Sequence, residues 1–486
     1  PHRSFVPLPE YDRETPTARE KELRRQLCEF VKRGYQQRLM ISTEGSFSAR
    51  LDDDSFLITP YQMDRSRLTV EDIVLVRDGR IEKVGRFHAR AGTRIDAGGA
   101  LAMPGFVQAH VHLCQTLFRG AGEDLPLLPW LRKIVWPMEA AHDRASLMAS
   151  ARLACAEMIR GGTTSFLSME TVRGTDATLE AVAECGLPGV VGHCLMDETG
   201  GYPPLAVDID DGLAACDVLA DSLRGTPNLR IAVAPRFALS CSADNLREAA
   251  DFARSRGHLL HTHASEQAAE IEWIRGRTGM DNVRYLHECG LSGPDVCLAH
   301  CVQVDLRERA LLAEAGTRVL HCPGANLKLG SGLAPVPEML DAGITVGLGA
   351  DGAACNNRLD IFAEMRLAGL IQKVRLGPDA LPARDIVRMA TQGGAAATGW
   401  GGETGILEAG RRADLVLIDL DDLSILPGDD PASAVVYAAH PGAVAMTMAA
   451  GRILYENGEF ATLDVDRIRR DAREQRLRLA RRAGLA

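Results

Sequence analysis

Between residues 104 and 400 the sequence alternates short apolar runs with amphipathic helical stretches, and this alternation limits the possible folds more than any other feature. The pattern is typical of βα units that build a parallel sheet, because each helix returns the chain to the start of the next strand. The strand-like runs are Gly189–Val191, Arg230–Ala234, His258–Thr262, Val296–Ala299, Thr317–Leu320 and Thr345–Leu348. We therefore predict an α/β fold, a (β/α)8 TIM-type barrel, which needs about 250 residues.

Polar side chains follow these apolar runs at the points where the strands end. They are Arg236, His263, His300, His321 and Asp351. In a (β/α)8 barrel the chemistry collects at the carboxyl ends of the strands, where the βα loops begin. We expect these side chains to meet at one mouth of the barrel.

The segments on both sides of the barrel have a different pattern. Residues 71–103 and 406–460 show strand-like alternation, and the first contains the turn signals Asp78-Gly79 and Gly98-Gly99. Together they predict a small β-sandwich domain built from both flanks. The expected domains are an N-terminal extension at 1–65, a composite β-domain at 66–103 and 406–460, the barrel at 104–405, and a C-terminal helix at 461–486.

Charge and cysteine usage exclude several partners. The net charge of −10 argues against a nucleic-acid or acidic membrane surface. The basic stretch Arg467–Arg482 is interleaved with acids and leucines, which indicates a solvated amphipathic helix. The 12 cysteines form no CxxC pair, and no apolar run suits a signal peptide or a membrane span. We expect a reduced cytoplasmic protein that acts on a small molecule and forms a homo-oligomer, a dimer or larger.

A metal site is indicated where the first barrel strand ends. His110 and His112 are two apart, so in a strand both imidazoles point to the same side. An HxH pair alone is weak evidence, but His263, His300 and Asp351 follow later strands as further candidate ligands. Imidazole nitrogens with a carboxylate suit one divalent ion, Zn²⁺ or alternatively Fe²⁺.

Five motifs in order give the sequence a specific resemblance. PGFVQAHVHL, HTHASE, AHC, HCPGANLKLGSG and GLGADGAACNN resemble the cytosine, guanine and adenosyl-type deaminase branch of the amidohydrolase superfamily, which includes the triazine hydrolases. The similarity runs from about residue 71 to 460. It implies a metal held by His110, His112, His263 and Asp351. It also implies that His300 orients the attacking water.

The chemistry of these residue types agrees with that resemblance. A bound metal acidifies its water into hydroxide near neutral pH, and the hydroxide can attack an electron-poor ring carbon. Glu266 lies three residues after His263, close enough to move a proton to a ring nitrogen and then to a leaving amine. Asp351 can act as ligand and proton acceptor, and neutral His300 can hydrogen-bond the developing tetrahedral centre.

The substrate is predicted from two further stretches. LFRGAGEDLPLLPWLRKIVWPMEA resembles the adenosyl-type deaminases that act on S-adenosylhomocysteine, methylthioadenosine or 5′-deoxyadenosine, and Glu139 would bind the ribose hydroxyls there. Glu266 favours ammonia as the leaving group, because amine departure needs a general acid. We therefore predict an aminohydrolase that releases ammonia from a 5′-modified purine nucleoside.

Other interpretations of the substrate and the function remain open. PRFALSCS resembles guanine deaminases in placing Arg236 against the purine, and Gln115 matches their amide contact. His321 is a candidate substrate contact or support. The alternatives are a guanine-type deaminase (guanine or 8-oxoguanine), a deaminase of another aminated N-heterocycle, or a triazine hydrolase. A non-catalytic metal-binding scaffold is the remote alternative, although it predicts a missing ligand or proton-transfer residue, and none is missing.

The N-terminal segment carries a second resemblance. Residues 27–76 resemble the start of class II aldolase and adducin domains, with matches at Gly45–Arg50 and Thr59-Pro60. The rest of that domain, with its zinc-binding histidines, is absent. We therefore expect a structural lead-in or a subunit contact and no aldolase activity.

Overall fold

The computed structural model describes residue 25 and the ranges 48–52, 55–58, 74–83, 92–93, 100–197 and 202–485. The chain divides into two compact units. The first comprises residues 1–102 and 408–410, and the second comprises 103–407 and 411–486. The predicted turn at Gly98-Gly99 and the Thr59-Pro60 match lie outside the described residues.

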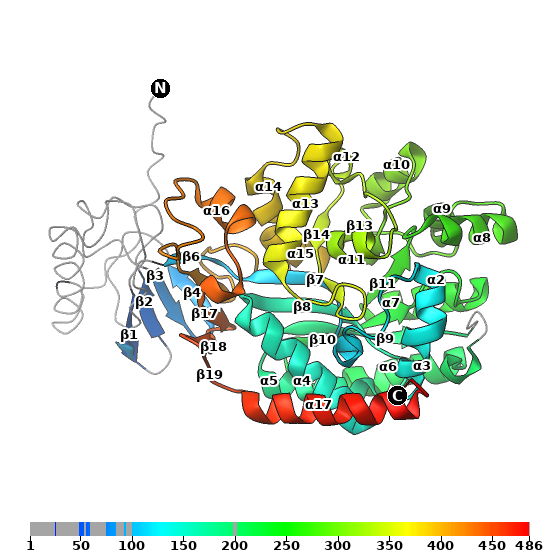
Figure 1. Cartoon of the computed structure of the whole chain (residues 1–486), viewed down its shortest axis with the longest axis horizontal. Helices are drawn as coiled ribbons and strands as arrows, with labels where there is room; N and C mark the ends of the chain where they lie inside the picture. Colours follow the sequence, from blue (N-terminus) through cyan, green and yellow to red (C-terminus); the bar gives the residue numbers. More distant parts are fainter. Residues whose placement is uncertain are drawn as a thin grey trace. The chain divides into compact units, whose positions relative to one another are not determined.

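The second unit is built around a closed parallel sheet (Figure 1). Its strands are β7 (Phe106–His112), β8 (Thr163–Met169), β9 (Gly189–Leu195), β10 (Leu229–Pro235), β11 (Leu259–Ala264), β12 (Val296–His300), β13 (Arg318–His321), β14 (Val346–Leu348) and β15 (Asp351–Gly352). β14 pairs with β13 and β15 pairs with β7, so β14 and β15 are two parts of one eighth strand that closes the barrel. The predicted (β/α)8 barrel is confirmed, and the six strand-like runs fall on β9 to β14.

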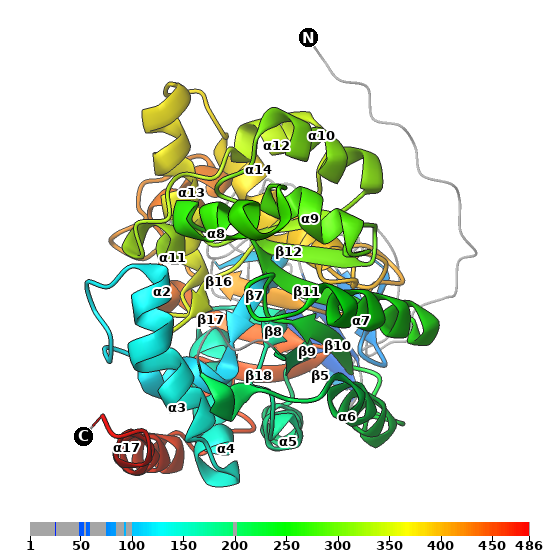
Figure 2. The ribbon, with the colours of Figure 1, turned by 90° about the vertical axis from the view of Figure 1, so that its right-hand side faces the viewer.

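Helices surround these strands (Figure 2). They are α4 (Arg144–Arg160), α5 (Thr175–Cys185), α6 (Ile209–Ser222), α7 (Ala243–Arg256), α8 (Ala268–Thr278), α9 (Asn282–Glu288), α10 (Leu306–Ala315), α11 (Pro323–Lys328), α12 (Val336–Asp341) and α13 (Ile361–Leu376). Between β7 and α4 the chain also forms η2 (Leu113–Phe118), α2 (Leu127–Trp130), η3 (Leu131–Val135) and α3 (Trp136–Ala140). This insertion follows directly on the HxH pair, which makes it part of the barrel mouth.

The barrel interior is filled mainly by small aliphatic side chains. Ala109, Ala232 and Ala299 are fully buried in one cluster with Trp400, the largest side chain in it. These small residues, from β7, β10 and β12, leave space for the indole, and the burial of so large an apolar group favours folding. The described cysteines are likewise buried and unpaired, as expected for small core residues.

The flanking β-segments form two further sheets. In the first unit the strands β1 (Ser48–Asp52), β2 (Ser55–Ile58), β3 (Val74–Arg77), β4 (Arg80–Lys83) and β5 (Gly92–Thr93) have the order β1-β5-β2-β3-β4. Asp78 and Gly79 have φ of 50° and 73°, the left-handed pair that a two-residue hairpin turn requires, so this turn prediction is confirmed.

The other sheet combines a strand before the barrel with strands after it. β6 (Leu101–Pro104) lies beside β16 (Leu415–Ile418), followed by β17 (Val444–Ala449), β18 (Arg452–Glu456) and β19 (Glu459–Phe460). The four strands β16 to β19 pair antiparallel in chain order. The domain boundaries drawn from the sequence stay a prediction.

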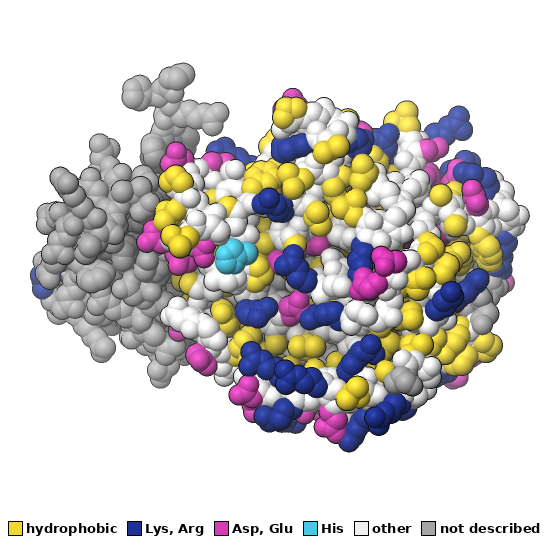
Figure 3. All heavy atoms as spheres, in the orientation of Figure 1, with side chains coloured by type: hydrophobic (Ala, Val, Ile, Leu, Met, Phe, Trp, Pro, Cys, Tyr) yellow, Lys and Arg dark blue, Asp and Glu magenta, His cyan; other side chains and the backbone are white. Residues whose placement is uncertain are grey.

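The basic C-terminal stretch forms the helix α17 (Val465–Arg482). Ile468, Ala472 and Leu479 lie on its buried face, and the helix lies along α4 in Figures 1 and 2. Figure 3 shows basic and acidic side chains interspersed on the visible face of the protein, including this edge. No helix in the described part of the chain is long and apolar enough to cross a membrane.

Candidate metal centre and active site

Four predicted ligands meet at the carboxyl ends of their strands. His110 and His112 come from β7, His263 from β11 and Asp351 from β15. One ligand atom from each lies within 4.8 Å of the others. Asp351 Oδ1 is 3.3 Å from His110 Nε2 and 3.1 Å from His112 Nε2. The barrel thus assembles one three-nitrogen, one-carboxylate group from residues far apart in the sequence.

Backbone carbonyls determine which ring nitrogen is free in two of these histidines. His112 Nδ1 lies 2.7 Å from the Met169 carbonyl oxygen, and His263 Nδ1 lies 2.7 Å from that of Arg236. A carbonyl only accepts hydrogen bonds, so each Nδ1 carries the proton and each neutral ring leaves a lone pair on Nε2. The two Nε2 atoms are 3.3 Å apart. Two lone pairs and a carboxylate at this separation repel each other unless a cation lies between them.

His261 orients the third histidine. Its Nε2 lies 2.8 Å from His110 Nδ1, so it can accept that proton and leave His110 Nε2 free for a metal. The sequence interpretation assigned His261 no role. The available signal was its position two residues before His263 on one strand, which places both rings on the interior side.

The pKa values of the four ligand side chains favour binding of a cation. Burial holds the pKa of His110 at about 4, and burial with neighbouring histidines holds the pKa of His263 well below its usual range. Burial opposes ionisation of Asp351, yet hydrogen bonds with His110 and His112 keep its pKa well below the usual value. Burial lowers the pKa of His112, but the hydrogen bond with Asp351 and the charge of Asp351 outweigh burial and raise it, and a bound ion would take the place of that proton. Three imidazoles with free Nε2 atoms and one carboxylate are then the donor set that a divalent transition ion prefers. The residues therefore fit the predicted metal.

His300 lies beside the ligand group at the end of β12. Its Nε2 is 4.0 Å from Asp351 Oδ2 and 3.5 Å from Glu266 Oε2. Its Nδ1 lies 2.9 Å from Asn326 Oδ1, which fixes the ring orientation. Asn326 belongs to the HCPGANLKLGSG motif, but nothing in that motif identifies it as the partner of His300.

Glu266 is the buried carboxyl group of the site. Burial, together with the negative charge of Asp351, raises its pKa to about 8, so it is mostly protonated at neutral pH. Ser331 Oγ donates to Glu266 Oε1 over 3.4 Å. A proton shuttle requires a protonated carboxyl close to the metal ligands, and Glu266 has this position.

The backbone is left-handed at three strand ends of the site. Ser265, His300 and Asp351 have φ of 52°, 73° and 59°. Such conformations cost about 1–3 kcal/mol each in residues other than glycine, and they concentrate at functional sites. Here they turn the chain sharply as the strands end at the barrel mouth.

Glu170 supports the chain just after the HxH pair. Its two carboxylate oxygens accept hydrogen bonds from the backbone N–H groups of Leu113 and Cys114, at 3.2 and 3.0 Å. Burial raises the pKa of Glu170. The sequence interpretation did not identify this residue, because a Glu after a strand has many possible partners.

Three predicted substrate residues form one buried cluster. Arg236 donates to Glu139 through Nη1 at 2.5 Å and Nη2 at 3.2 Å. Gln115 Nε2 donates to Glu139 Oε1 at 2.9 Å. The Arg236 guanidinium has a raised pKa, because the Glu139 charge outweighs the effect of burial. In the structure, Arg236 and Gln115 therefore both hydrogen-bond to Glu139 at the site.

A narrow pocket lies over the four metal-ligand residues. It is lined by His112, Gln115, Leu127, Trp130, Leu131, Arg236, Phe237, His263, Glu266, His300, Leu329 and Asp351. Its free volume is about 20 Å³, and α2 contributes two of the apolar residues. This volume admits roughly one water, so a larger substrate requires the pocket wall to move.

His321 lies apart from this pocket. It ends β13, is buried, and neither of its ring nitrogens has a hydrogen-bond partner among the described residues. Burial lowers its pKa to about 3. Its role as a substrate contact or support stays a prediction.

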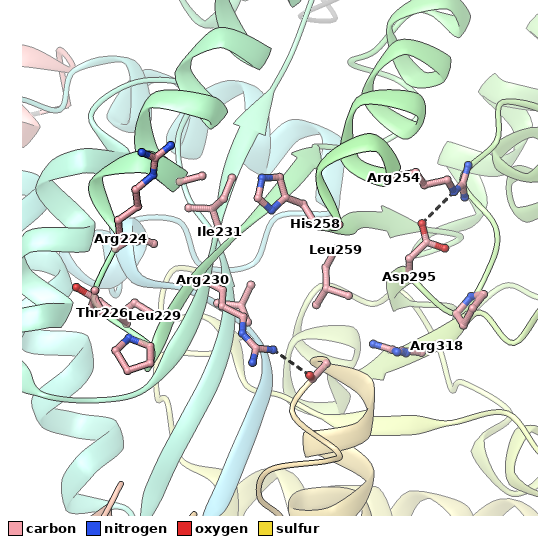
Figure 4. A pocket seen from close by; sticks show the side chains of 18 residues that line it. Arg224, Thr226, Leu229, Arg230, Ile231, Arg254, His258, Leu259, Asp295 and Arg318 are labelled. Atoms are coloured by element: carbon pink, nitrogen blue, oxygen red, sulfur yellow. Dashed lines mark hydrogen bonds and ion pairs between the residues drawn. The ribbon is translucent and has the colours of Figure 1, made fainter.

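A much larger cavity lies at the opposite end of the strands (Figure 4). Its volume is about 900 Å³. Arg230 and Leu259, near the starts of β10 and β11, line it together with Arg254 and Asp295, which form an ion pair. None of the predicted ligands lines it. Size therefore does not identify the reaction site, since barrel chemistry takes place at the carboxyl ends.

Comparisons with known proteins agree with this geometry. Residues 101–454 match the Amidohydrolase family, and residues 25–97 match the Class II Aldolase and Adducin N-terminal domain. The 5-methylthioadenosine/S-adenosylhomocysteine deaminase of Syntrophobacter fumaroxidans is 40% identical over 402 residues, 81% of this chain and 90% of the relative. The 5′-deoxyadenosine deaminase of Methanothermobacter thermautotrophicus is 38% identical over 85% of this chain and 96% of its own.

A solved structure is similar over the same extent. The adenosine deaminase from Xanthomonas campestris with bound Zn superposes with a TM-score of 0.79 at 33% identity. The alignment covers 84% of this chain and 94% of that one. The resemblance stated from the motifs is thus confirmed for the barrel and for the N-terminal segment.

Proposed function

The chain belongs to the amidohydrolase family and is a hydrolase of C–N bonds, and from this premise we propose that it deaminates 5′-modified adenine nucleosides. The substrates are of the S-adenosylhomocysteine, methylthioadenosine or 5′-deoxyadenosine type. Water replaces the amine on the purine ring, and ammonia leaves. Relatives that carry these names align with more than four fifths of the chain.

The observation that carries the proposal is the position of Glu266. Its buried carboxyl lies beside the ligand group, 3.5 Å from His300 Nε2, with a pKa of about 8. A group that is protonated near neutral pH can protonate a ring nitrogen and later the departing amine. A chloride leaving group does not need that acid, so this carboxyl favours deamination.

A bound divalent ion would be held by His110, His112, His263 and Asp351. It supplies an activated water near neutral pH. Glu266 carries a proton at neutral pH, so it would first donate that proton to the ring nitrogen. It could then take up a proton from the attacking water and pass it to the leaving amine. His300, held by Asn326, faces the reacting carbon and positions the water.

Asp351 has a second function beyond that of ligand. Its Oδ2 faces His300 at 4.0 Å while Oδ1 faces the two β7 histidines. It can accept a proton as the tetrahedral centre forms. Zinc rather than iron, a homo-oligomer of two or more copies, and a cytoplasmic location are our further proposals from the sequence.

The test is a substrate panel with the purified zinc-loaded protein. Methylthioadenosine, S-adenosylhomocysteine, 5′-deoxyadenosine, guanine, 8-oxoguanine, cytosine and an aminated triazine are each followed by absorbance and by ammonia release. We expect turnover of the three nucleosides at a kcat/KM at least about tenfold above that of the free bases, since each extra hydrogen bond contributes about 0.5–1.5 kcal/mol. Turnover confined to guanine, 8-oxoguanine or the triazine would overturn the nucleoside assignment.

A further inference from the structure

One buried carboxylate outside the pocket joins two segments of the barrel mouth. Glu364 lies on α13, is 1% exposed, and is not among the described residues that line the pocket. Its Oε2 accepts a hydrogen bond from the Gly324 backbone N–H at 2.8 Å, and its Oε1 accepts one from Asn356 Nδ2 at 2.7 Å. Gly324 belongs to the HCPGANLKLGSG motif and Asn356 to the GLGADGAACNN motif. Glu364 therefore connects two motifs that come from different strand ends.

The first connection leads to His300. Gly324 lies in the first turn of α11, where a backbone N–H has no acceptor within the helix, and Glu364 supplies that acceptor. Two residues further along α11 is Asn326, whose Oδ1 lies 2.9 Å from His300 Nδ1. A shift at the start of α11 would therefore move the group that holds the His300 ring.

The second connection leads to Asp351. The Asn356 amide has two N–H groups, and Nδ2 donates both to Glu364 and to the Ala350 carbonyl oxygen, each at 2.7 Å. Ala350 directly precedes the metal ligand Asp351, whose backbone is left-handed with a φ of 59°. Such a backbone persists in a residue other than glycine only when neighbouring contacts hold it. Asn356 supplies one of these contacts, and Glu364 orients Asn356.

The contact between these groups leaves no room for a further side-chain atom. A Cβ atom at position 324 would lie 2.5 Å from Glu364 Oε1 and 2.7 Å from Asn356 Nδ2. Glycine at this position therefore allows the close approach of the other two side chains. Burial raises the pKa of Glu364 to about 7, whereas the hydrogen bonds from Asn356 and Gly324 lower it. At pH 8 the carboxylate is mostly ionised, and both of its oxygens accept.

We propose that Glu364 is a positioning residue, which keeps His300 and Asp351 in fixed relative positions through its two hydrogen bonds. The inference rests on the proposed function, because that function gives His300 the attacking water and Asp351 the metal ion. His300 Nε2 lies 4.0 Å from Asp351 Oδ2. His300 can orient the water only while its ring keeps this distance from the metal ligands. Glu364 itself does not contact the substrate.

The test replaces Glu364 with Gln. A Gln side chain has one acceptor oxygen and one NH₂ donor, so its NH₂ must face an N–H group of Gly324 or Asn356. Asn356 can turn its amide over to remove that conflict, but the Ala350 carbonyl then loses its donor. Either rearrangement breaks one of the two connections.

The expected effects are on the metal and on kcat. Zn²⁺ affinity, measured by competition titration at pH 8, should fall by about 10- to 100-fold, and kcat with methylthioadenosine at saturating Zn²⁺ should fall by a similar factor. KM should stay within about threefold of wild type, since the residues that line the pocket are unchanged. The absorption spectrum of the Co²⁺-loaded protein should also change, because it depends on ligand geometry.

Glu308→Gln is the matched control. Glu308 is a buried carboxylate that accepts from the backbone N–H groups of Val283 and Asp305, and it lies outside the pocket. A merely structural role for Glu364 predicts that both variants lower Tm and leave Zn²⁺ affinity, the Co²⁺ spectrum and kcat normal. That result would overturn the inference, and so would a raised KM with normal kcat and normal Zn²⁺ affinity.

Two further variants serve if Glu364→Gln does not fold. Asn356→Leu breaks the connection to Asp351 and should lower Zn²⁺ affinity by about 10- to 100-fold, whereas Gly324→Ala displaces Glu364 and should lower kcat by a similar factor. Normal values in both variants would overturn the inference. A wild-type protein that turns over no nucleoside would overturn the proposed function, while Zn²⁺ affinity and the Co²⁺ spectrum of the variants would still decide the role of Glu364.

Discussion

Glu266→Gln keeps the shape of the side chain and removes its titratable proton. In the wild type, burial and the charge of Asp351 raise the Glu266 pKa to about 8, so most molecules carry the proton at pH 7. General acid–base catalysis contributes about 10²–10⁴-fold, so kcat should fall by this factor. The loss corresponds to about 3–5 kcal/mol of activation free energy. Metal content should stay unchanged, because Glu266 is not among the ligands.

The same substitution has a measurable effect on stability in the metal-free protein. A Glu carboxyl has an ordinary pKa of 4.5, against about 8 in the folded protein. Between these values the folded protein keeps a proton that the unfolded chain releases, so the free energy of unfolding decreases as pH rises. Glu266→Gln removes this decrease. The variant should be more stable than the wild type at pH 8, by at most about 5 kcal/mol, and the difference should vanish below pH 4.5.

Ammonia release at pH 7, metal content, and thermal denaturation of the chelator-treated protein at pH 5 and pH 8 measure these effects. Glu308→Gln is the matched control, since Glu308 is also buried with a pKa that burial raises, yet lies outside the pocket. It accepts from the backbone N–H groups of Val283 and Asp305, so its loss should lower stability and leave kcat unchanged. A metal-loaded Glu266→Gln protein with kcat within about threefold of wild type would refute the proton shuttle. Superimposable pH–stability curves would refute the raised pKa.

Three further predictions concern the metal centre. Removing the ion with a chelator should abolish ammonia release and lower Tm, and Zn²⁺ should restore both; a protein that stays active after verified removal contradicts the metal assignment. His261→Phe should weaken Zn²⁺ affinity by about 10- to 100-fold in a competition titration, because His110 loses its Nδ1 partner; unchanged affinity would exclude His261 from orienting the ligand. Asn326→Leu should lower kcat by about 10- to 100-fold at normal metal content, since the His300 ring is no longer held; an equal loss of metal would instead indicate a structural role.

The barrel was predictable because its signal is local. A buried parallel strand needs a short apolar run, and each run from Gly189 to Leu348 coincides with a strand. The ligand pair His110 and His112 was predictable for the same reason, since the two-residue period of a strand puts both rings on one side. His263 and Asp351 followed from their place at later strand ends.

The supporting residues were not predictable in this way. His261, Asn326 and Glu170 each act through a partner on another strand or loop. The place of His261 two residues before His263 was one available signal, but nothing near Asn326 or Glu170 in the sequence distinguishes them from buried polar residues in general. His321 shows the opposite case, because its strand-end position resembled that of the ligands while the structure leaves it outside the pocket.

The sequence by itself determined the barrel, the motif residues at its mouth and the kind of ion that their side chains suit. Those properties depend on residue type and on spacing within single strands. Only the tertiary structure decided which groups surround Glu139. Arg236 lies 97 positions away from it, yet the fold places their charged groups 2.5 Å apart. A carboxylate can accept from a substrate only through lone pairs that its neighbours leave unused, and the fold determines those neighbours.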